Sequence, residues 1–590
     1  MEVNTCYSTS RDRNKLCCES GITGVIENNT PIAGRCVSSA RVESFIKASL
    51  TSAGSQASLS GSNTDSAVQT VVSTVIVVSV AASTQISNQT TFSTQLPSIT
   101  LLTSMTPSAS STGSVSSIET SKLNSTSYTE LAPTPTQFPS LTPSPTTLAT
   151  NTTKTPIPAT STSTGTAGKP VFIHYMVNGI EDAHIEQDVK DIVALGIDAV
   201  ALNLNTVTES WATKTVDCIF VHAEANGLKL FFSFDMTGFN NPDEFIIFLQ
   251  SYVTKTAHYT YNGLPFVSTF NGGASEFAFG ESTVNDGWKV KLQEEMFSAG
   301  HPIYFVPSFQ DTPCTETFFS TEFPALDGIF NWNSWAADGS SKVTTTQDTI
   351  YLSSAQSSAK SYMMGISPLQ FKHMDAADNW YIPGPGNMED RFSQVLNLQP
   401  DFIELQTWND GGEGHYMGNI WSEAYTTVPQ IMASIAHYNH TAYNQVLPSF
   451  IKAYKAGVTS TSTMYPTNGK NAQGLFYNHA LLKNADCSAD RLGRPTGADL
   501  VEDVVAGMIL IARGEIGYTA TVSVGGNTLG SAQKLSPGFN AISIDGLTAG
   551  KVTMTVKDAS GTTVISGTGS QDVLSSSSLC NYNFQVVALA

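Results

Sequence analysis

Two carboxylates lie three residues apart in a glycine-rich segment, residues 407–416, that directly follows a short apolar run. The segment is Thr-Trp-Asn-Asp-Gly-Gly-Glu-Gly-His-Tyr, so Trp408 and Tyr416 flank Asp410 and Glu413. Cleavage of a glycosidic bond needs one carboxylic acid to protonate the leaving oxygen and one carboxylate to activate water or attack carbon. Aromatic rings beside the acids could stack on sugar. The segment therefore predicts a glycosidase site, with an ordinary solvated turn as the alternative.

Asp235 is a third carboxylate at the end of an apolar run, which covers residues 230–234. Its alternative role is to cap a helix, because a helical pattern begins at Pro242. Asn240 and Asn241 lie closer to that start and are better placed as caps. We therefore predict a functional role for Asp235.

Other polar and aromatic residues lie in or just after apolar runs. His174 could bond substrate or be a satisfied core histidine. Trp332 and Trp335 could be sugar platforms or simple packing, and Gln310 follows a further run. The sequence contains no G-x-S-x-G, P-loop or H-E-x-x-H motif and no metal-ligand cluster, so we predict neither a cofactor nor a metal.

Eight short apolar runs alternate with amphipathic stretches, which is typical of repeated β/α units and a parallel sheet. The predicted strands cover residues 171–177, 198–204, 228–234, 265–270, 302–309, 326–332, 362–369 and 401–407. The clearer helices cover 185–196, 211–227, 242–253, 284–300, 344–361 and 388–398, and 313–323 is the weakest. This pattern predicts an α/β fold, a (β/α)₈ TIM barrel with its reactive groups at the carboxyl ends of the strands. An open doubly wound sheet is the alternative, but it often carries a glycine-rich phosphate turn that is missing here.

The remaining chain has a different character on each side of the barrel. After residue 465, short alternating strands at 518–524, 541–544 and 551–556 predict a small antiparallel β-sandwich. Residues 51–168 are rich in Ser, Thr and Pro and poor in aromatic residues, which predicts a disordered, O-glycosylated stalk. The predicted domains are therefore a small cysteine-containing module (1–50), the linker (51–168), the catalytic barrel (169–464) and an accessory sandwich (465–590).

Cysteines and sequons favour an exported protein. Cys6, Cys17, Cys18 and Cys36 cluster at the N-terminus, where we expect disulfides among them, with zinc as the less favoured alternative. We also expect Cys487 to bridge to Cys580, on the basis of shared location alone. Asn-x-Ser/Thr sequons occur at Asn28, Asn88, Asn124, Asn151 and Asn439. No signal peptide is visible at the start of this chain.

The formal net charge of −20 argues against nucleic acid, which requires a cationic surface, and suits a neutral polymer such as a polysaccharide. The apolar run at residues 71–78 is far shorter than the about 20 residues that span a bilayer. We therefore expect no stable membrane insertion. We also expect a secreted monomer, with a place at the cell wall only as a family resemblance implies it.

Several of these residues together resemble glycoside hydrolase family 71, the fungal α-1,3-glucanases or mutanases. The matching segments are 174–177, 196–203, 231–236, 327–332, 365–368 and 408–416. The resemblance covers about residues 169–440 and, more loosely, the C-terminal region. It departs from the family at Gly411, where Tyr or Phe is usual, and at Gly414, where Ser is usual. We expect both glycines to loosen the loop that carries the acids.

The resemblance implies an endo-acting hydrolase of α-1,3-glucan that inverts the anomeric carbon, with catalytic or essential roles for Asp235, Asp410 and Glu413. We assign Glu413 as acid, Asp410 as base and Asp235 as a positioning group, although sequence alone would allow the roles to be exchanged. An inverting pair is expected to lie roughly 6.5–9.5 Å apart. The predicted substrate-binding residues are His174, Asn203, Gln310, Trp332, Trp335, Trp408, Asn409, His415 and Tyr416. The alternatives are a non-catalytic glucan-binding protein and a stalked cell-wall structural protein.

Overall fold

The computed structural model describes residues 168–590, apart from 311, 338, 339 and 341, together with the backbone of five short strands near the N-terminus. Those strands are β1 (Thr5–Ser8), β2 (Lys15–Cys18), β3 (Ile22–Glu27), β4 (Arg35–Ser38) and β5 (Val75–Val77). The chain divides into two units, Met1–Thr150 and Asn151–Ala590. The backbones of Cys6 and Cys17 are register partners. The predicted N-terminal disulfides and, apart from β5 and Gly168, the predicted stalk lie outside the described residues.

The second unit has a mixed α/β fold built on a parallel sheet. Its eight parallel strands are β6 (Val171–Met176), β7 (Ala199–Leu204), β8 (Lys229–Asp235), β10 (Leu264–Phe270), β11 (Tyr304–Phe305), β12 (Gly328–Asn331), β13 (Ser361–Ile366) and β16 (Phe402–Leu405). Each predicted strand range contains one of these observed strands, which extends beyond that range by at most one residue. The strand order is β11-β10-β8-β7-β6-β16-β13-β12, so the first and last parallel strands of the chain are neighbours. The short strand β9 (Thr260–Tyr261) pairs antiparallel with β10.

The two outer strands of this sheet also contact each other. The Asp327 amide donates to the Phe305 carbonyl at 3.1 Å, and the Phe330 amide donates to the Pro307 carbonyl at 2.8 Å. Residues from all eight parallel strands or their immediate extensions also form one buried apolar cluster, which includes Phe172, Ala201, Phe231, Phe266, Val306, Phe330, Met363 and Phe402. One side of every strand therefore faces a common interior.

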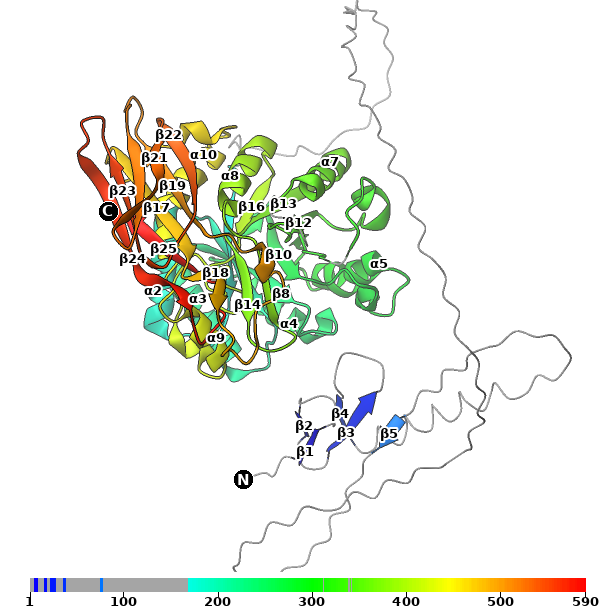
Figure 1. The fold of residues 1–590 in the computed structure, drawn as a ribbon. Coiled ribbons are helices and arrows are strands. Elements are labelled where there is room, and N and C mark those ends of the chain that lie inside the picture. Colours follow the sequence, from blue (N-terminus) through cyan, green and yellow to red (C-terminus); the bar gives the residue numbers. More distant parts are fainter. Residues whose placement is uncertain are drawn as a thin grey trace, which may run out of the picture. The chain divides into compact units, whose positions relative to one another are not determined.

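Helices follow most of the parallel strands and surround the sheet (Figure 1). They are α2 (Asp182–Leu195), α3 (Ser210–Asn226), α4 (Ile246–Tyr252), α5 (Val284–Trp288), α6 (Glu295–Ser298), α7 (Thr346–Ser358), α8 (Asn387–Leu398), α9 (Pro429–Ile435) and α10 (Leu447–Lys455). The α2 helix buries Ile185, Val189 and Ile192, which share one face at helical spacing. The weakest predicted helix, 313–323, contains only the π-helical turn η4 (Phe318–Glu322). Among the described residues, no helix has the length and apolarity that a membrane crossing requires.

The C-terminal region forms two sheets that share a core. The strands are β17 (Ala472–His479), β18 (Leu481–Asp486), β19 (Val504–Ile511), β20 (Thr519–Val524), β21 (Asn527–Lys534), β22 (Gly538–Asp545), β23 (Gly550–Lys557), β24 (Thr563–Ser576) and β25 (Phe584–Leu589). Their orders are β22-β19-β17-β25 and β18-β24-β23-β20-β21. Apolar side chains such as Phe476, Val505, Val522 and Met554 pack between them. The sheets are not purely antiparallel as predicted, because β18 pairs with β24 in parallel.

A β-hairpin, which the sequence analysis did not predict, lies between β13 and α8. Its strands β14 (Gln370–His373) and β15 (Asn379–Ile382) pair antiparallel. Successive side chains of a strand point to opposite faces. Phe371, His373 and Tyr381 share one face, and each is at most 3 % exposed. The opposite face carries Gln370 and Lys372.

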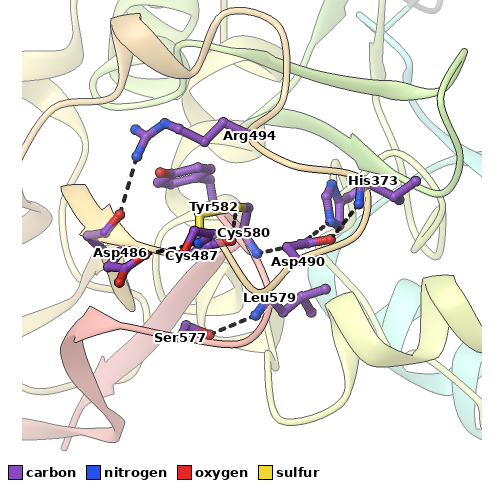
Figure 2. The surroundings of a disulfide bond; sticks show 12 residues. His373, Asp486, Cys487, Asp490, Arg494, Ser577, Leu579, Cys580 and Tyr582 are labelled. Carbon is purple, nitrogen blue, oxygen red and sulfur yellow. Dashed lines mark hydrogen bonds and ion pairs between the residues drawn. A yellow bond between two sulfur atoms is a disulfide. The ribbon is translucent and has the colours of Figure 1, made fainter.

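The C-terminal region fixes the buried face of this hairpin (Figure 2). The Asp490 carboxylate lies 2.8 Å from His373 Nε2 and accepts the Cys580 amide at 2.7 Å. Cys580 forms a disulfide with Cys487, 93 residues away in the chain. The predicted Cys487–Cys580 bridge is thus confirmed, and it lies beside the residues that anchor β14.

A buried ion pair joins helices α7 and α8 behind β13. Arg391 Nη1 lies 2.7 Å from Asp348 Oδ2, and its Nη2 lies 2.7 Å from the Gly365 carbonyl of β13. Both charged side chains are completely buried. The pair therefore ties two helices to the strand that precedes the hairpin.

We predict that Arg391→Met lowers the free energy of unfolding by about 3–5 kcal/mol, because it leaves the Asp348 carboxylate buried without its cation. Urea unfolding monitored by circular dichroism measures this change. Lys190→Met is the control, since Lys190 forms an ion pair with Glu186 on the exposed face of α2 and should change stability by no measurable amount. Equal, small effects of the two substitutions would contradict the proposed importance of the buried pair.

Candidate active site

The acid-bearing segment folds into a closed loop at the carboxyl end of β16. The Trp408 amide donates to the His174 carbonyl at 2.7 Å, which joins the loop to β6, and the Met417 amide donates to the Thr407 carbonyl at 2.9 Å, which closes it. Within the loop, the Asp410 amide donates to Thr407 Oγ1 at 2.8 Å and the Glu413 amide donates to Asp410 Oδ1 at 3.1 Å. The two carboxylates therefore lie together, with their side chains 15 % and 29 % exposed.

Three nitrogen-bearing side chains contact these carboxylates. His415 Nε2 lies 3.1 Å from Asp410 Oδ2 and 3.7 Å from Glu413 Oε2. Lys372 Nζ lies 3.4 Å from Glu413 Oε1, and Gln370 Nε2 donates to Glu413 Oε2 at 3.3 Å. His415 belongs to the predicted loop, whereas Lys372 and Gln370 come from β14. Sequence reasoning missed these two, because the only local signal was the alternation of polar residues 370 and 372 with apolar neighbours.

The surroundings shift the pKa values of the two acids in opposite directions. Burial by itself would raise the pKa of Asp410, but the hydrogen bond and charge of His415 and the charge of Lys372 bring it below its usual value. Burial, and next the negative charge of Asp410, raise the pKa of Glu413, against the opposing effects of His415 and Lys372. Burial lowers the pKa of His415, but Asp410 and Glu413 outweigh it, and the pKa rises. Paired groups with opposed shifts are typical of an acid and a base.

Asp235 lies at the end of β8, and the charge of Asp410 in the loop acts on its carboxylate. Burial raises its pKa, and the negative charge of Asp410 adds to the rise, while the Thr237 hydrogen bonds and His174 oppose it. The helix-capping role belongs to Asn241, whose side chain accepts the Asp243 amide at 2.8 Å. Asp235 is therefore free of that structural task, in agreement with the sequence analysis.

His174 is a buried residue with a partner that the sequence analysis missed. Its Nδ1 lies 2.8 Å from Glu404 Oε1, and both side chains are at most 1 % exposed. Burial raises the pKa of Glu404. Glu404 is a lone acid inside the apolar run Phe-Ile-Glu-Leu of β16, which was a signal that sequence reasoning could have used. Trp332 packs edge-on against His174, with 4.8 Å between ring centroids.

The remaining predicted binding residues divide into two groups. Trp332 and Trp335 approach the loop, with ring centroids 6.2 Å and 6.3 Å from that of His415. Trp335 is half-buried, whereas Trp332 is only 6 % exposed. Asn203 is buried in β7 and Gln310 is half-buried beyond β11. Neither is hydrogen-bonded to Asp410 or Glu413 within the described part of the chain.

Direct contact with sugar was also expected of Trp408, Asn409 and Tyr416, but the structure places these side chains in the protein interior. Trp408 and Tyr416 are fully buried, and Tyr416 stacks on His440 with 3.9 Å between centroids. Asn409 bonds the Met176 amide and carbonyl, at 2.8 Å and 3.1 Å. These side chains point inward for two reasons. Burial of the aromatic rings of Trp408 and Tyr416 is favourable, and Asn409 satisfies the backbone amide and carbonyl at the end of β6. In this structure these side chains pack inside the protein and help to hold the loop.

The two glycines do not loosen the loop in the way expected. At Gly411 a side chain would contact Ile435 and Tyr425, and the Tyr425 hydroxyl accepts the Gly411 amide at 2.9 Å. Gly414 has a φ of +72°, and a Cβ there would lie 3.0 Å from the Phe371 carbonyl. That close approach lets the Phe371 amide donate to the Glu413 carbonyl at 2.8 Å. The glycines therefore permit contacts that hold the loop against its neighbours.

Asp410, Glu413 and His415 could in geometric terms hold a cation, since one donor atom from each lies within 4.8 Å of the others. The sequence analysis did not predict this cluster. However, His415 Nε2 already contacts Asp410, and the Lys372 ammonium already supplies positive charge at Glu413. The donor set therefore fits a compensated proton-transfer pair better than a metal centre.

A cavity of about 530 Å³ adjoins the loop, and its lining includes Gln370 and Trp335. A second cavity of about 450 Å³ lies between η6 (Thr441–Gln445) and strands β24 and β25, and no acid is among its lining residues. The lining of the first cavity contains no acid either, but Gln370 in that lining donates to Glu413, so the first cavity is the one beside the candidate site.

Comparison with known proteins identifies the family of this chain. The model of glycosyl hydrolase family 71 matches residues 167–590. The glucan endo-1,3-alpha-glucosidase agn1 of Schizosaccharomyces pombe is 32 % identical over 433 residues, which cover 71 % of this chain and 94 % of that protein. The ascus wall endo-1,3-alpha-glucanase of the same organism is 27 % identical, covering 72 % and 98 %. A mutanase of Penicillium rubens is 28 % identical, covering 71 % and 88 %.

Solved structures resemble the chain only weakly. A GH99 endo-alpha-mannosidase from Bacteroides thetaiotaomicron has a TM-score of 0.34 and 9 % identity, covering 49 % of this chain and 98 % of its own. An endo-beta-1,4-mannanase from Thermotoga petrophila has a TM-score of 0.32 and 9 % identity, covering 68 % and 97 %. We draw no conclusion from TM-scores this low. The family match over most of the chain, and the relatives that align with it, confirm the resemblance found in the sequence: this chain belongs to glycosyl hydrolase family 71.

Proposed function

We propose that this protein is an endo-acting hydrolase of α-1,3-glucan in which Glu413 is the general acid and Asp410 the general base. The observation that carries the proposal is the pair itself: two carboxylates on one loop, with opposed pKa shifts, beside a cavity. The substrate class comes from the relatives, whose names specify endo-1,3-alpha-glucanases and a mutanase.

The proposed reaction assigns one proton movement to each acid. Glu413, whose raised pKa favours the protonated form, donates its proton to the glycosidic oxygen as the bond to the anomeric carbon breaks. Asp410, whose lowered pKa favours the carboxylate, accepts a proton from the attacking water. His415 holds Asp410 in place, and Asp235 orients the water or the sugar. The predicted roles in substrate binding stay part of this proposal, although all of these side chains except Gln310 and Trp335 are buried in this structure: His174, Asn203, Gln310, Trp332, Trp335, Trp408, Asn409, His415 and Tyr416.

The spacing of the two acids bears on whether the reaction inverts or retains the configuration of the anomeric carbon. One oxygen of Asp410 lies within 4.8 Å of one oxygen of Glu413. Inverting pairs are usually roughly 6.5–9.5 Å apart, and retaining pairs roughly 5–5.5 Å. The short gap is thus a specific observation in favour of retention, with Asp410 as nucleophile. The proposal of inversion rests instead on the resemblance to family 71, and it requires the bound sugar to separate the two side chains so that water can enter beside Asp410.

We further infer the finer architecture and the setting of the enzyme. The contacts between β11 and β12 support a closed (β/α)₈ barrel over residues 169–464, and the shared core of the C-terminal sheets supports an accessory β-sandwich over 465–590. The Cys487–Cys580 disulfide supports a secreted, wall-associated protein, because disulfides persist in oxidising compartments. We infer that the protein acts as a monomer on a polysaccharide, and that residues 1–50 and 51–168 are a separate module and a stalk.

A non-catalytic glucan-binding protein is the alternative function, and a stalked structural protein is another. The sequence analysis based the first on a loop loosened by Gly411 and Gly414. Tyr425 and Phe371 pack against those glycines, which removes the reason for that alternative. Retention of Asp235, Asp410 and Glu413 favours the enzyme over both.

We predict that Glu413→Gln and Asp410→Asn each reduce kcat on α-1,3-glucan by at least about 100-fold, because each removes one partner of acid–base catalysis. Release of reducing ends measures kcat, and circular dichroism checks the fold. Glu294→Gln is a matched control, because Glu294 pairs with Lys289 on the exposed surface and should leave kcat unchanged. Near-normal turnover in both loop variants would rule out this loop as the catalytic one.

The pH profile of kcat/KM should be bell-shaped and should respond to Lys372. Activity rises with pH as Asp410 ionises and falls as Glu413 loses its proton. Because Lys372 lowers the pKa of both acids, Lys372→Met should move both limbs to higher pH. Lys551→Met, which removes a surface cation paired with Asp572 on the C-terminal sheet, should leave the profile unchanged. An unmoved profile, or a shift to lower pH, in Lys372→Met would contradict the assignment.

The anomer of the fresh product tests the stereochemical proposal. Proton NMR recorded immediately after addition of enzyme to a soluble α-1,3-oligosaccharide should show the β-anomer first, because direct attack of water inverts the α-linked carbon. Fresh α-anomer would instead establish retention and make Asp410 the nucleophile. That result would leave Glu413 as the acid.

A further inference from the structure

The cavity beside the acids extends from the catalytic loop toward the C-terminal region. Its near end is formed by Gln370, which donates to Glu413, and by Trp335, whose ring lies 6.3 Å from His415. Its far wall is formed by Thr496, Gly497 and Leu500. The cavity therefore lies between a residue that contacts Glu413 and a part of the chain that takes no part in the proposed proton transfers.

The pleat of the β14–β15 hairpin determines which side chains face this cavity. Lys372 and Trp380 are register partners, as are Gln370 and Ile382. Register partners of an antiparallel pair lie on the same face, and so do residues two apart in one strand. Because Lys372 and Gln370 reach Glu413, Trp380 and Ile382 lie on the face turned toward the acids. Gln370, Trp380 and Ile382 all line the cavity.

The C-terminal segment is built onto the free edge of β15. The Tyr381 amide donates to the Thr496 carbonyl at 2.8 Å, and the Thr496 amide donates to the Asn379 carbonyl at 3.0 Å. Gly497 has a φ of +83°, and a Cβ there would overlap the Tyr381 carbonyl. Glycine is thus needed for this approach. These backbone hydrogen bonds therefore hold the far wall of the cavity against the hairpin.

The lining is suited to a neutral sugar. Its twelve described residues are Trp335, Ala336, Ala337, Ser340, Gln370, Trp380, Tyr381, Ile382, Pro383, Thr496, Gly497 and Leu500. None of them carries a charge, two are half-buried tryptophans, and Gln370, Ser340 and Thr496 offer hydrogen-bonding groups. Pockets for uncharged ligands combine apolar and aromatic walls with a few polar groups in this way, and about 530 Å³ lies within their usual size.

We propose that this cavity binds further glucosyl units of the α-glucan chain, beyond those that flank the cleaved bond, and that Trp380 supplies the ring on which one of them packs. This inference rests on the proposed function. It makes the hairpin and the segment at Thr496 part of the substrate site. Longer chains should gain affinity from the cavity, whereas chains too short to reach it should not.

The test is the dependence of kinetics on chain length. Trp380→Ala should raise KM for long α-1,3-oligosaccharides by about 10-fold, the effect of losing contact with one large aromatic face, and leave the shortest hydrolysed substrate unchanged. Trp380→Phe should keep most of the long-chain advantage. Phe297→Ala is the control. Phe297 lies on α6 and is 70 % exposed, so its removal should leave KM unchanged at every chain length. Circular dichroism verifies that each variant is folded.

A second measurement separates binding from positioning. Titration calorimetry of the long oligosaccharide into Glu413→Gln, with and without Trp380→Ala, should show the same loss of about 10-fold in affinity. Equal effects of Trp380→Ala on short and long substrates would mean that Trp380 acts through Lys372 and Glu413, which overturns the subsite. No effect at any length would also overturn it while leaving the proposed function intact. Failure of the unsubstituted protein to hydrolyse any α-1,3-glucan would instead refute the proposed function.

Discussion

Charge compensation at the loop that carries Asp410 and Glu413 is the constraint on which the candidate site depends. Two carboxylates three residues apart, both largely withdrawn from water, would repel each other unless positive charge lay nearby. His415 provides it from within the loop, and Lys372 provides it from β14. The unequal sharing of these cations separates the pKa values of Asp410 and Glu413. The same contacts therefore stabilise the loop and give its two acids different roles.

The need for Lys372 explains why the C-terminal region is part of this structure. A two-stranded hairpin is marginally stable by itself and must be packed on something. The buried face of β14 and β15 packs on the C-terminal region, where Asp490 contacts His373 and the Cys487–Cys580 disulfide holds the adjoining segments together. The opposite face is then free to present Lys372 to Glu413. The C-terminal sheets thus support the hairpin that completes the site.

The pleat of the hairpin also connects the two carboxylates with the cavity. One face packs on the C-terminal region through Phe371, His373 and Tyr381, although Tyr381 also lines the cavity, and the other face carries Gln370 and Lys372, which contact Glu413. Glycines take part wherever backbones approach closely, as Gly414 does beside Phe371 and Gly497 does beside Tyr381. A change that slipped the hairpin by one residue would exchange its two faces, and both the charge compensation and the sugar-facing wall would be lost.

Local patterns in the sequence determined the eight parallel strands, the position of Asp410 and Glu413 after the last of them, and the family. These features depend on short-range periodicity and on motifs within a few residues, which a single sequence displays directly. Only the tertiary structure decided that Trp408 and Tyr416 point inward, and that a hairpin supplies Lys372 to Glu413. Burial and charge pairing are contacts between residues far apart in the chain, and no local pattern specifies which distant residue will compensate a given carboxylate.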